Sequence, residues 1–228
     1  MSARHELIRA ASGPGTFLGN LPPESLEALL VDAEVIEARR GATVFAATEP
    51  ANRFGVVLDG ICRTYLTAND GRRLTVRYAR VGAVVASLTS ERAALSVQAM
   101  SDCSLLEVEL ATLQRAITVD GRVGLVLIGE VGQRLADTYA TLASNTFGSM
   151  RERVARHVLD LSVQGAEGQG LRALVTQQGL ADSVGTVREV VARVLRDMRL
   201  EGLVETKPGH IVILDPDRLA AIIGRDTT

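Results

Sequence analysis

The stretch at residues 176–204, TQQGLADSVGTVREVVARVLRDMRLEGLV, has the pattern of two short helices joined by a tight turn. Thr176 is the expected N-cap of the first helix, because its hydroxyl can accept a hydrogen bond from a free backbone N–H. Gly185 supplies the turn, since glycine adopts positive φ without steric cost. Thr186 and Glu189 have the T-x-x-E spacing of a capping box and predict the start of the second helix. The stretch therefore predicts a helix-turn-helix.

The second helix separates apolar from charged side chains. Its apolar residues recur every three or four positions and form one stripe, namely Val187, Val191, Val194, Leu195 and Met198. Its other face carries Arg188, Glu189, Arg193, Arg196 and Arg199. Arginine pairs with the O6/N7 edge of guanine, and a carboxylate accepts from the N4 amine of cytosine. We therefore expect Arg188, Glu189 and Arg193 to read bases, and Arg196 and Arg199 to contact phosphates.

A β-hairpin is predicted directly after this helix. Residues 203–206 and 211–214 have strand composition, and 207–210, KPGH, have the composition of a turn. Such a hairpin is the wing of a winged helix-turn-helix, and Lys207 at its turn is expected to contact a phosphate. Thr176 and Thr186, at the two predicted helix starts, complete the set of candidate DNA contacts. An amphipathic surface helix with solvated charges is the alternative, and the paired start signals and the hairpin argue against it.

The amino-acid composition limits the class of protein to which the chain can belong. Apolar residues make up 46% of the 228 residues, aromatic residues only 3%, and tryptophan is absent, so we expect a core of Val, Leu, Ala and Ile. No apolar run approaches the roughly 20 residues of a membrane span, and two cysteines do not make a disulfide framework. We expect a reduced cytoplasmic protein. The net charge of −2 does not exclude DNA binding, because phosphate contacts require positive charge only locally.

In the N-terminal half the apolar residues are spaced differently along the sequence. A short helix is predicted over residues 22–33, followed by short strands separated by turn signals. The strands are expected at 34–38, 43–45, 54–58, 61–65, 74–78, 96–99 and 104–108. Many short strands about ten residues apart are typical of a β-roll of the jelly-roll kind. The predicted fold class is therefore α+β, with an N-terminal roll and a C-terminal winged helix-turn-helix.

A long helix is predicted between these two parts. Asp120 is its expected N-cap, and it continues to about Thr146. Its seam has nearly heptad spacing and consists of Leu127, Val131, Leu135, Thr138, Leu142 and Asn145. A seam of this kind favours a parallel homodimer, which would place two recognition helices on a palindrome. The alternative is a long helix that lies across its own domain.

Three domains follow from these elements. We expect a β-roll sensor domain over 1–119, a dimerisation helix over 120–147 and a DNA-binding domain over 148–228. The hinge between the last two is expected near Gly148, because Ser149 and Glu152 form another capping box. Residues 165–170, GAEGQG, are expected to be a flexible linker within the DNA-binding domain.

This order of parts resembles the cyclic-AMP receptor protein/FNR (Crp/Fnr) family of transcription regulators. The strongest match is residues 184–195, VGTVREVVARVL, which are similar to the family's recognition helix with its R-E-x-x-x-R pattern. A second match runs from Glu49-Pro50 through Gly60 in the roll. The resemblance implies a homodimer that binds double-stranded DNA at half-sites containing GTGA and works with RNA polymerase.

The effector site departs from the family pattern. Cyclic-AMP-binding members have a Gly-Glu pair and an Arg-Ser pair, where this chain has Ala86-Ser87 and Ala93-Ala94. Positions that the resemblance assigns to an effector pocket are Ala86, Ser87, Leu88, Arg92, Ala94, Arg134, Thr138 and Tyr139. Cyclic AMP or another small effector is possible, and no cofactor is specified. For haem, only His5, in an N-terminal tail expected to be loose, could reach a sensor pocket.

Three classes of function compete. A DNA-binding regulator with a degenerate nucleotide pocket, responding to another effector or to none, is favoured over a cyclic-AMP-responsive regulator with an unusual pocket. An interaction module with a vestigial helix-turn-helix is disfavoured by the intact Arg188, Glu189 and Arg193. An enzyme is not expected, because we find no nucleophile elbow, phosphate-binding loop or metal-ligand spacing.

Overall fold

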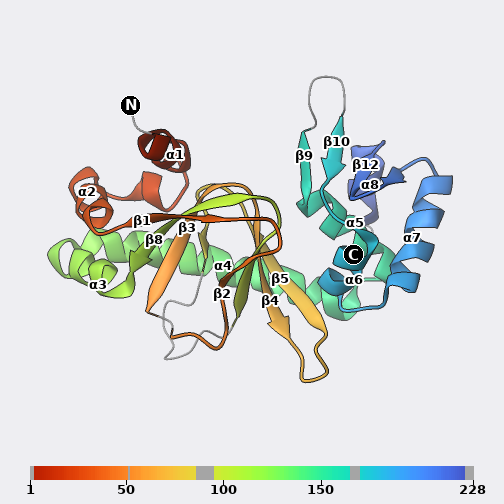
Figure 1. The fold of residues 1–228 in the computed structure, drawn as a ribbon, viewed down its shortest axis with the longest axis horizontal. Helices are drawn as coiled ribbons and strands as arrows, with labels where there is room; N and C mark the ends of the chain where they lie inside the picture. The colour runs from red at the N-terminus through yellow and green to blue at the C-terminus, as the bar shows by residue number, and fades with distance from the viewer. Residues whose placement is uncertain (1–2, 51, 86–94, 165–169, 224–228) are drawn as a thin grey trace. The chain divides into compact units, whose positions relative to one another are not determined.

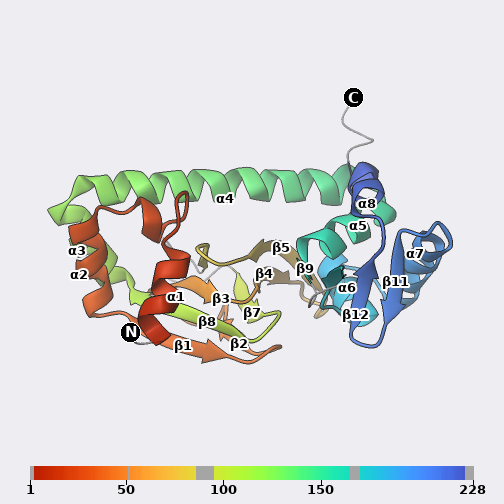
Figure 2. The same cartoon turned by 90° about the horizontal axis from the view of Figure 1, so that it is seen from above.

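The computed structural model describes residues 3–50, 52–85, 95–164 and 170–223. The chain divides into two compact units, of which the first comprises residues 1–66 and 77–138 and the second residues 67–76 and 139–228. The boundary lies within the long helix α4 (Gly121–Phe147), which is one continuous helix (Figure 2). None of the helices in the described residues is long and apolar enough to cross a membrane.

The roll of the first unit consists of two four-stranded sheets with the strand orders β1-β8-β3-β6 and β2-β7-β4-β5 (Figure 1). The strands are β1 (Glu34–Ala38), β2 (Thr43–Phe45), β3 (Arg53–Asp59), β4 (Cys62–Thr67), β5 (Arg73–Ala79), β6 (Val84–Val85), β7 (Ser96–Ala99) and β8 (Cys103–Glu109). The helices beside them are α1 (Ala3–Ala11), the 3₁₀ helix η1 (Leu18–Asn20), α2 (Pro23–Val31) and α3 (Leu110–Val119). The predicted strands are thus confirmed to within about two residues at each end.

Two apolar clusters fill the roll. One joins the strands to the helices and includes Phe17 and Phe54, whose rings meet edge to face at a centroid distance of 6.0 Å. Val123 near the start of α4 is completely buried in the same cluster. The other cluster lies between the two sheets and includes Phe45, Val57 and Leu105. The core is mainly aliphatic, as the low aromatic content predicts.

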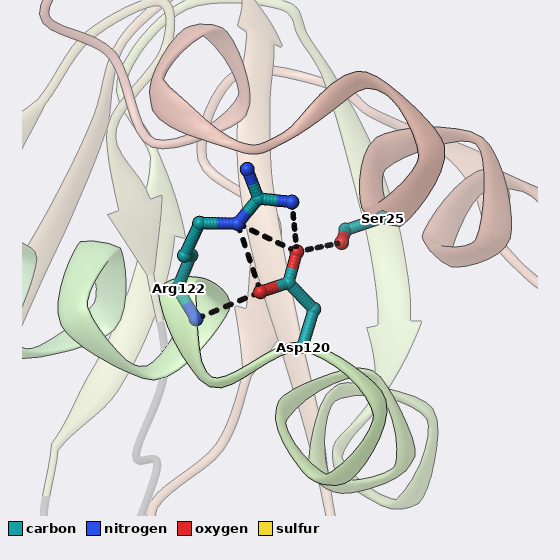
Figure 3. A network of polar contacts seen from close by, with 3 residues as sticks. All are labelled: Ser25, Asp120 and Arg122. Carbon is teal, nitrogen blue, oxygen red and sulfur yellow. Dashed lines mark hydrogen bonds and ion pairs between the residues drawn. The ribbon is translucent and has the colours of Figure 1, made fainter.

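The predicted start of the long helix is confirmed by a polar network around Asp120 (Figure 3). Asp120 Oδ1 accepts a hydrogen bond from the backbone N–H of Arg122 at 3.0 Å, which is the expected capping interaction. Ser25 of α2 donates to Asp120 Oδ2 at 3.3 Å, and Arg122 Nη2 donates to the same oxygen at 2.8 Å. The hydrogen bonds from Arg122 hold the pKa of Asp120 below its usual value. The network joins α2 to the first turn of α4.

The N-terminal tail differs from the prediction. His5 lies in α1, a regular helix, and not in a loose segment. Arg4 Nη2 donates to the carbonyl oxygens of Leu30 at 3.1 Å and Ala33 at 2.8 Å, so a distant part of the chain holds α1 in place. The sequence also did not predict α3 or the two-residue strand β6. Each of these depends on packing against the roll more than on a local pattern.

The second unit is a helical bundle with a small sheet. It contains α5 (Met150–Asp160), β9 (Ser162–Gln164), β10 (Leu171–Ala173), α6 (Gln177–Val184), α7 (Arg188–Leu200), β11 (Val204–Lys207), β12 (His210–Ile213) and α8 (Pro216–Ile223). The capping box of Ser149 and Glu152 at the start of α5 is confirmed. The predicted hairpin is β11 and β12, with Gly209 at φ 78° in its turn.

The sheet of the second unit is larger than predicted. Its strand order is β11-β12-β10-β9, so the wing hairpin is extended by two further strands. The expected linker at residues 165–170 lies mostly outside the described residues, which resume at Gly170. The segments on its two sides pair as the antiparallel strands β9 and β10. The sequence did not predict these strands or α8.

Candidate nucleic-acid interface

The first helix of the predicted helix-turn-helix, α6, forms as expected. Thr176 is its N-cap, and its hydroxyl accepts a hydrogen bond from the backbone N–H of Gly179 at 3.0 Å. Gly185 ends the helix in the left-handed conformation with φ 69°. Positive φ at this turn favours glycine because it has no Cβ. The local signals at both ends of α6 therefore predicted its structure.

The predicted capping box at the second helix, α7, is wrong. The N-cap is Val187, which has extended backbone angles and makes no side-chain capping hydrogen bond. The helix consequently begins at Arg188, one residue later than the T-x-x-E spacing requires. The backbone N–H of Thr186 instead donates to Ala181 O at 3.0 Å and so closes the end of α6. The backbone N–H of Thr186, which a capping box at α7 would use, is thus already bonded to the end of α6.

One face of α7 is anchored in the core of the second unit. Val191, Leu195 and Met198 are buried there, as the apolar stripe predicts. Val194 is only partly buried, and Val187 is 57% exposed, so the first residue of the predicted stripe is outside the core. Burying three apolar side chains of this size contributes roughly 1.5–3 kcal/mol each and fixes the rotation of α7 about its axis.

The opposite face of α7 presents the predicted charged side chains. All five are exposed, namely Arg188, Glu189, Arg193, Arg196 and Arg199. Arg196 lies 3.6 Å from Asp197, and both side chains are largely in solvent, so this ion pair holds the guanidinium only weakly. Because the buried stripe sets the helix rotation, the charged face is directed outward as a unit. Its chemistry fits base edges and phosphates.

A groove of about 540 Å³ separates the start of α6 from the wing hairpin. Three predicted contact residues, Thr176, Arg188 and Lys207, line it together. Arg193, Arg196 and Arg199 lie further along α7 and do not line this groove. Lys207 is half-exposed and lies 3.3 Å from the carboxylate of Glu205 on the same strand. The fold therefore brings one cation from the helix and one from the wing to the same depression, and this local positive charge suits a phosphate backbone.

Several residues of this groove were not predicted. They are Gln177, Gln178, Thr206, Pro208 and Gly209. Gln178 Nε2 donates to Asp182 Oδ1 at 2.8 Å, which holds its amide along the surface of α6. The position of Gln177 and Gln178 directly after the N-cap was the available signal, because backbone N–H groups of a first helical turn favour anions.

The candidate effector residues are only partly within the described structure. Ala86, Ser87, Leu88, Arg92 and Ala94 lie outside the described residues. Arg134 is partly buried on α4, and burial lowers its pKa, with a further decrease caused by the positive charge of Arg77. Thr138 is exposed and donates its hydroxyl hydrogen bond to Arg134 O at 2.8 Å, within its own helix. Tyr139 is 60% exposed.

Arg77 is a neighbour of this region that the sequence did not single out. It extends from β5, and its Nη2 donates to Val84 O at 2.8 Å. Its Nη1 lies 4.0 Å from Glu130 of α4, and the exposed fractions of the two side chains are 13% and 18%. Burial lowers the pKa of Arg77, while Glu130 and Asp137 act in the opposite direction. A cation from a sheet and the carboxylate of Glu130 on α4 therefore lie close to Arg134.

The seam of α4 contains apolar side chains that remain in contact with solvent. Val131 is 44% exposed, Leu135 50% and Leu142 60%, and neighbouring Leu125 and Ile128 are exposed to nearly 70%. A continuous apolar stripe on one helix is costly to leave in water. The single chain buries none of these five residues completely.

Sequence models of two domains match this chain. The model described as a Crp-like helix-turn-helix domain matches residues 152–222, and the model described as a cyclic nucleotide-binding domain matches residues 35–136. They correspond to the second unit and to the roll with the first part of α4, respectively. The two elements that were derived above from local patterns thus match independent domain models in the same order.

Curated relatives cover most of the chain. The CRP-like cAMP-activated global transcriptional regulator of Mycobacterium tuberculosis is 27% identical over 214 residues, which is 90% of this chain and 95% of the relative. The cAMP-activated global transcriptional regulator Vfr of Pseudomonas aeruginosa is 26% identical over 183 residues, or 75% of this chain and 85% of the relative.

Solved structures are similar in fold. A transcriptional regulator of the CRP family from Thermus thermophilus has a TM-score of 0.72 and 25% identity, covering 83% of this chain and 96% of that one. FixK2 from Bradyrhizobium japonicum has a TM-score of 0.72 and 22% identity over the same shares of the two chains.

Proposed function

The chain belongs to the Crp/Fnr family of transcription regulators, which bind DNA and are not enzymes, and from this premise we propose that it acts as a homodimer on a palindrome with GTGA-like half-sites. The observation that carries the proposal is the exposed face of α7. Arg188, Glu189 and Arg193 are held outward there by the buried Val191, Leu195 and Met198. Two arginines beside one carboxylate have the donors and the acceptor that G and C bases require.

The remaining candidate contacts surround this face. Arg196, Arg199 and Lys207 are assigned to phosphates, and Thr176 and Thr186 to the DNA backbone. The homodimer is supported by the exposed seam of α4, since pairing two copies would remove Val131, Leu135 and Leu142 from water. We assign residues 1–119 to a sensor domain, 120–147 to the dimerisation helix and 148–228 to DNA binding. The regulator would act in the cytoplasm together with RNA polymerase.

Fluorescence anisotropy tests the proposal directly. The protein is titrated into a labelled duplex that carries a GTGA palindrome and into a scrambled duplex of equal length and composition. We expect preference for the palindrome by at least about a thousandfold, which is at the lower end for specific recognition. Equal affinity for the two duplexes would refute sequence-specific binding, and no binding to either would favour an interaction module.

The effector is the second part of the proposal. We propose that cyclic AMP binds weakly or not at all, and that the roll responds to another ligand or to none. A buried phosphodiester requires a paired cation or several donors. Ala93 and Ala94 offer neither, and Ala86-Ser87 lacks the carboxylate that would accept from the ribose. Losing a charge-assisted hydrogen bond costs about 1.5–3 kcal/mol, so two losses would change micromolar affinity to millimolar.

A cyclic-AMP-responsive regulator is the alternative, because two relatives are described as activated by cyclic AMP. Calorimetry on ligand-free protein distinguishes the two possibilities. A dissociation constant below about 10 micromolar, which corresponds to about 7 kcal/mol, would establish the alternative if Thr138→Ala abolished the binding. We expect instead that titration with millimolar cyclic AMP gives heat changes too small to fit.

A further inference from the structure

The two cysteines of the chain meet inside the roll, although they are far apart in the sequence. Cys62 Sγ and Cys103 Sγ are 3.7 Å apart and separated by 41 positions in the chain. Cys62 is the first residue of β4, and Cys103 is the first residue of β8. The two strands belong to different sheets of the roll. A bond between the sulfur atoms would therefore connect the two sheets covalently.

Two surface turns bring the sulfur atoms together. The turn before Cys62 contains Gly60, and the turn before Cys103 contains Ser101. Ser101 Oγ accepts a hydrogen bond from the backbone N–H of Ile61 at 3.0 Å, which joins the turns. Gly60 has φ 83°, and a Cβ there would lie 2.8 Å from Cys103 Sγ and 2.4 Å from Asp102 O. Glycine is thus required at this position for the close approach of Cys103 to the turn.

The surroundings make the two thiols chemically different. The Cys62 thiol donates to Cys103 Sγ, and this hydrogen bond is the main reason that the pKa of Cys103 is lowered, to about 6. The same contact and burial raise the pKa of Cys62 well above its usual value. The hydroxyl of Ser101 lies 3.8 Å from Cys103 Sγ. Cys103 accepts the hydrogen bond from the other thiol and lies beside the surface turn, so we assign it as the nucleophile of the pair, which reacts as the thiolate.

Cys103 lies just beneath a turn that is exposed to solvent. Cys103 is buried with 2% of its surface exposed, but it directly follows Asp102, which is exposed, and Ser101, which is partly exposed. A small peroxide needs only a local opening of this turn to reach the sulfur atom.

We propose that Cys62 and Cys103 are a redox-active pair that a small hydroperoxide converts to an intramolecular disulfide. Cys103 thiolate attacks the terminal oxygen of the hydroperoxide, the O–O bond breaks, and a sulfenic acid forms at Cys103. The leaving alkoxide (hydroxide, if hydrogen peroxide is the oxidant) takes from solvent the proton that the Cys103 thiol had released and becomes an alcohol (or water). The Cys62 sulfur then attacks that sulfur atom, and the S–O bond breaks with release of water, which carries away the Cys62 proton. The two sulfur atoms must approach from 3.7 Å to about 2.05 Å to form the bond. The inference is independent of the proposed DNA-binding function.

Thiol counting tests this proposal. The folded, reduced protein is treated with hydrogen peroxide, quenched and then alkylated in denaturant, and its mass is measured. We expect the number of alkylated thiols to fall from two to none in a monomeric chain, and dithiothreitol to restore both. A urea-unfolded sample serves as the control for intrinsic reactivity. Two remaining thiols in the folded protein, or a disulfide only between two chains on a non-reducing gel, would overturn the proposal.

Single variants identify the role of each sulfur. In Cys62→Ser we expect a sulfenic acid at Cys103 that dimedone traps, because the serine hydroxyl can still donate to Cys103 Sγ and no second thiol is available to resolve the sulfenic acid. In Cys103→Ala we expect Cys62 to remain unmodified under the same conditions. Circular dichroism establishes that each variant is folded before it is used, and Cys103→Ser replaces Cys103→Ala if that variant is not folded. Dimedone labelling of Cys62 and not of Cys103 would contradict the assigned order of reaction.

Discussion

Arg151 and Glu201 form a bidentate ion pair that connects the start of α5 to the end of α7, the helix that we assign to base recognition. Arg151 Nη1 donates to Glu201 Oε1 at 2.7 Å, and Nη2 donates to Oε2 at 2.6 Å. Glu201 is the C-cap residue of α7, and Arg151 lies in the first turn of α5. The planar guanidinium matches both carboxylate oxygens at once, which restricts the orientation of the two helices more than a single contact would. The pair therefore helps to position the face that we assign to DNA.

The first prediction concerns the pH dependence of this pair. The hydrogen bonds from Arg151 lower the pKa of Glu201 below its ordinary value of 4.5. A carboxylate with a lowered folded-state pKa stabilises the fold above its unfolded-state pKa and loses that contribution as pH falls through the folded-state value. We expect Arg151→Met to melt at a modestly lower temperature than wild type at pH 7, and the difference to shrink below about pH 4.5.

Arg196→Met is the matched control for that prediction. Arg196 makes one exposed contact with Asp197 at 3.6 Å, so its loss should leave the melting temperature and its pH profile unchanged. Melting temperatures measured from pH 3 to 8 by circular dichroism would test both variants. A constant difference between Arg151→Met and wild type over this whole range would contradict the role of Glu201.

The second prediction concerns the seam of α4. Leu135→Asp places a charge in the centre of the proposed interface and should convert the dimer to monomers. Loss of a buried leucine costs about 1.5–3 kcal/mol in each copy, so the dimer should dissociate more easily by at least a hundredfold. Gln133→Glu adds a negative charge on the opposite side of the helix, where Gln133 is exposed and donates to Asp137 of its own helix, and should remain dimeric. Sedimentation velocity at micromolar protein distinguishes these outcomes, and a dimeric Leu135→Asp would rule out the seam.

The third prediction separates base reading from phosphate contact on α7. Arg193→Ala should cost about 1–3 kcal/mol per half-site and relax the preference at one base pair. Arg199→Ala should weaken the GTGA palindrome and the scrambled duplex alike and reduce the slope of log affinity against log salt by about one per lost contact. Anisotropy titrations at several salt concentrations measure both quantities. If Arg193→Ala retains the wild-type sequence preference, Arg193 is not a base reader.

The fourth prediction compares two threonines that look alike in the sequence. Thr176 caps α6 through its hydroxyl, whereas at α7 the N-cap is Val187 and not Thr186. Replacing a capping threonine by alanine costs about 1 kcal/mol. We expect Thr176→Ala to lower the free energy of unfolding by this amount, and Thr186→Ala to change it by less than about 0.5 kcal/mol. Urea denaturation of the two variants is the measurement. Equal losses of unfolding free energy would indicate that Thr186 also acts as a capping residue.

Local patterns predicted a large part of this protein. Alternating strands with glycine turns predicted most of the roll, and Asp120, Ser149, Thr176 and Gly185 marked helix ends that the structure has. These signals act through hydrogen bonds and backbone angles within a few residues, so they can be read without knowing the fold. The apolar stripe of α7 likewise identified Val191, Leu195 and Met198 as its buried face.

What the tertiary structure decided depends on residues that are distant in the chain. Helix α1 is held by hydrogen bonds from Arg4 to the carbonyl oxygens of Leu30 and Ala33, and Arg77 of β5 lies 4.0 Å from Glu130 of α4, 53 residues later in the chain. The contact between Cys62 and Cys103 and the ion pair between Arg151 and Glu201 have no local signal for the same reason. Even the start of α7 was decided beyond its own residues, because the N–H of Thr186 is used to close α6. A periodic pattern specifies which face of an element is buried, and only the packed chain determines which side chain it meets.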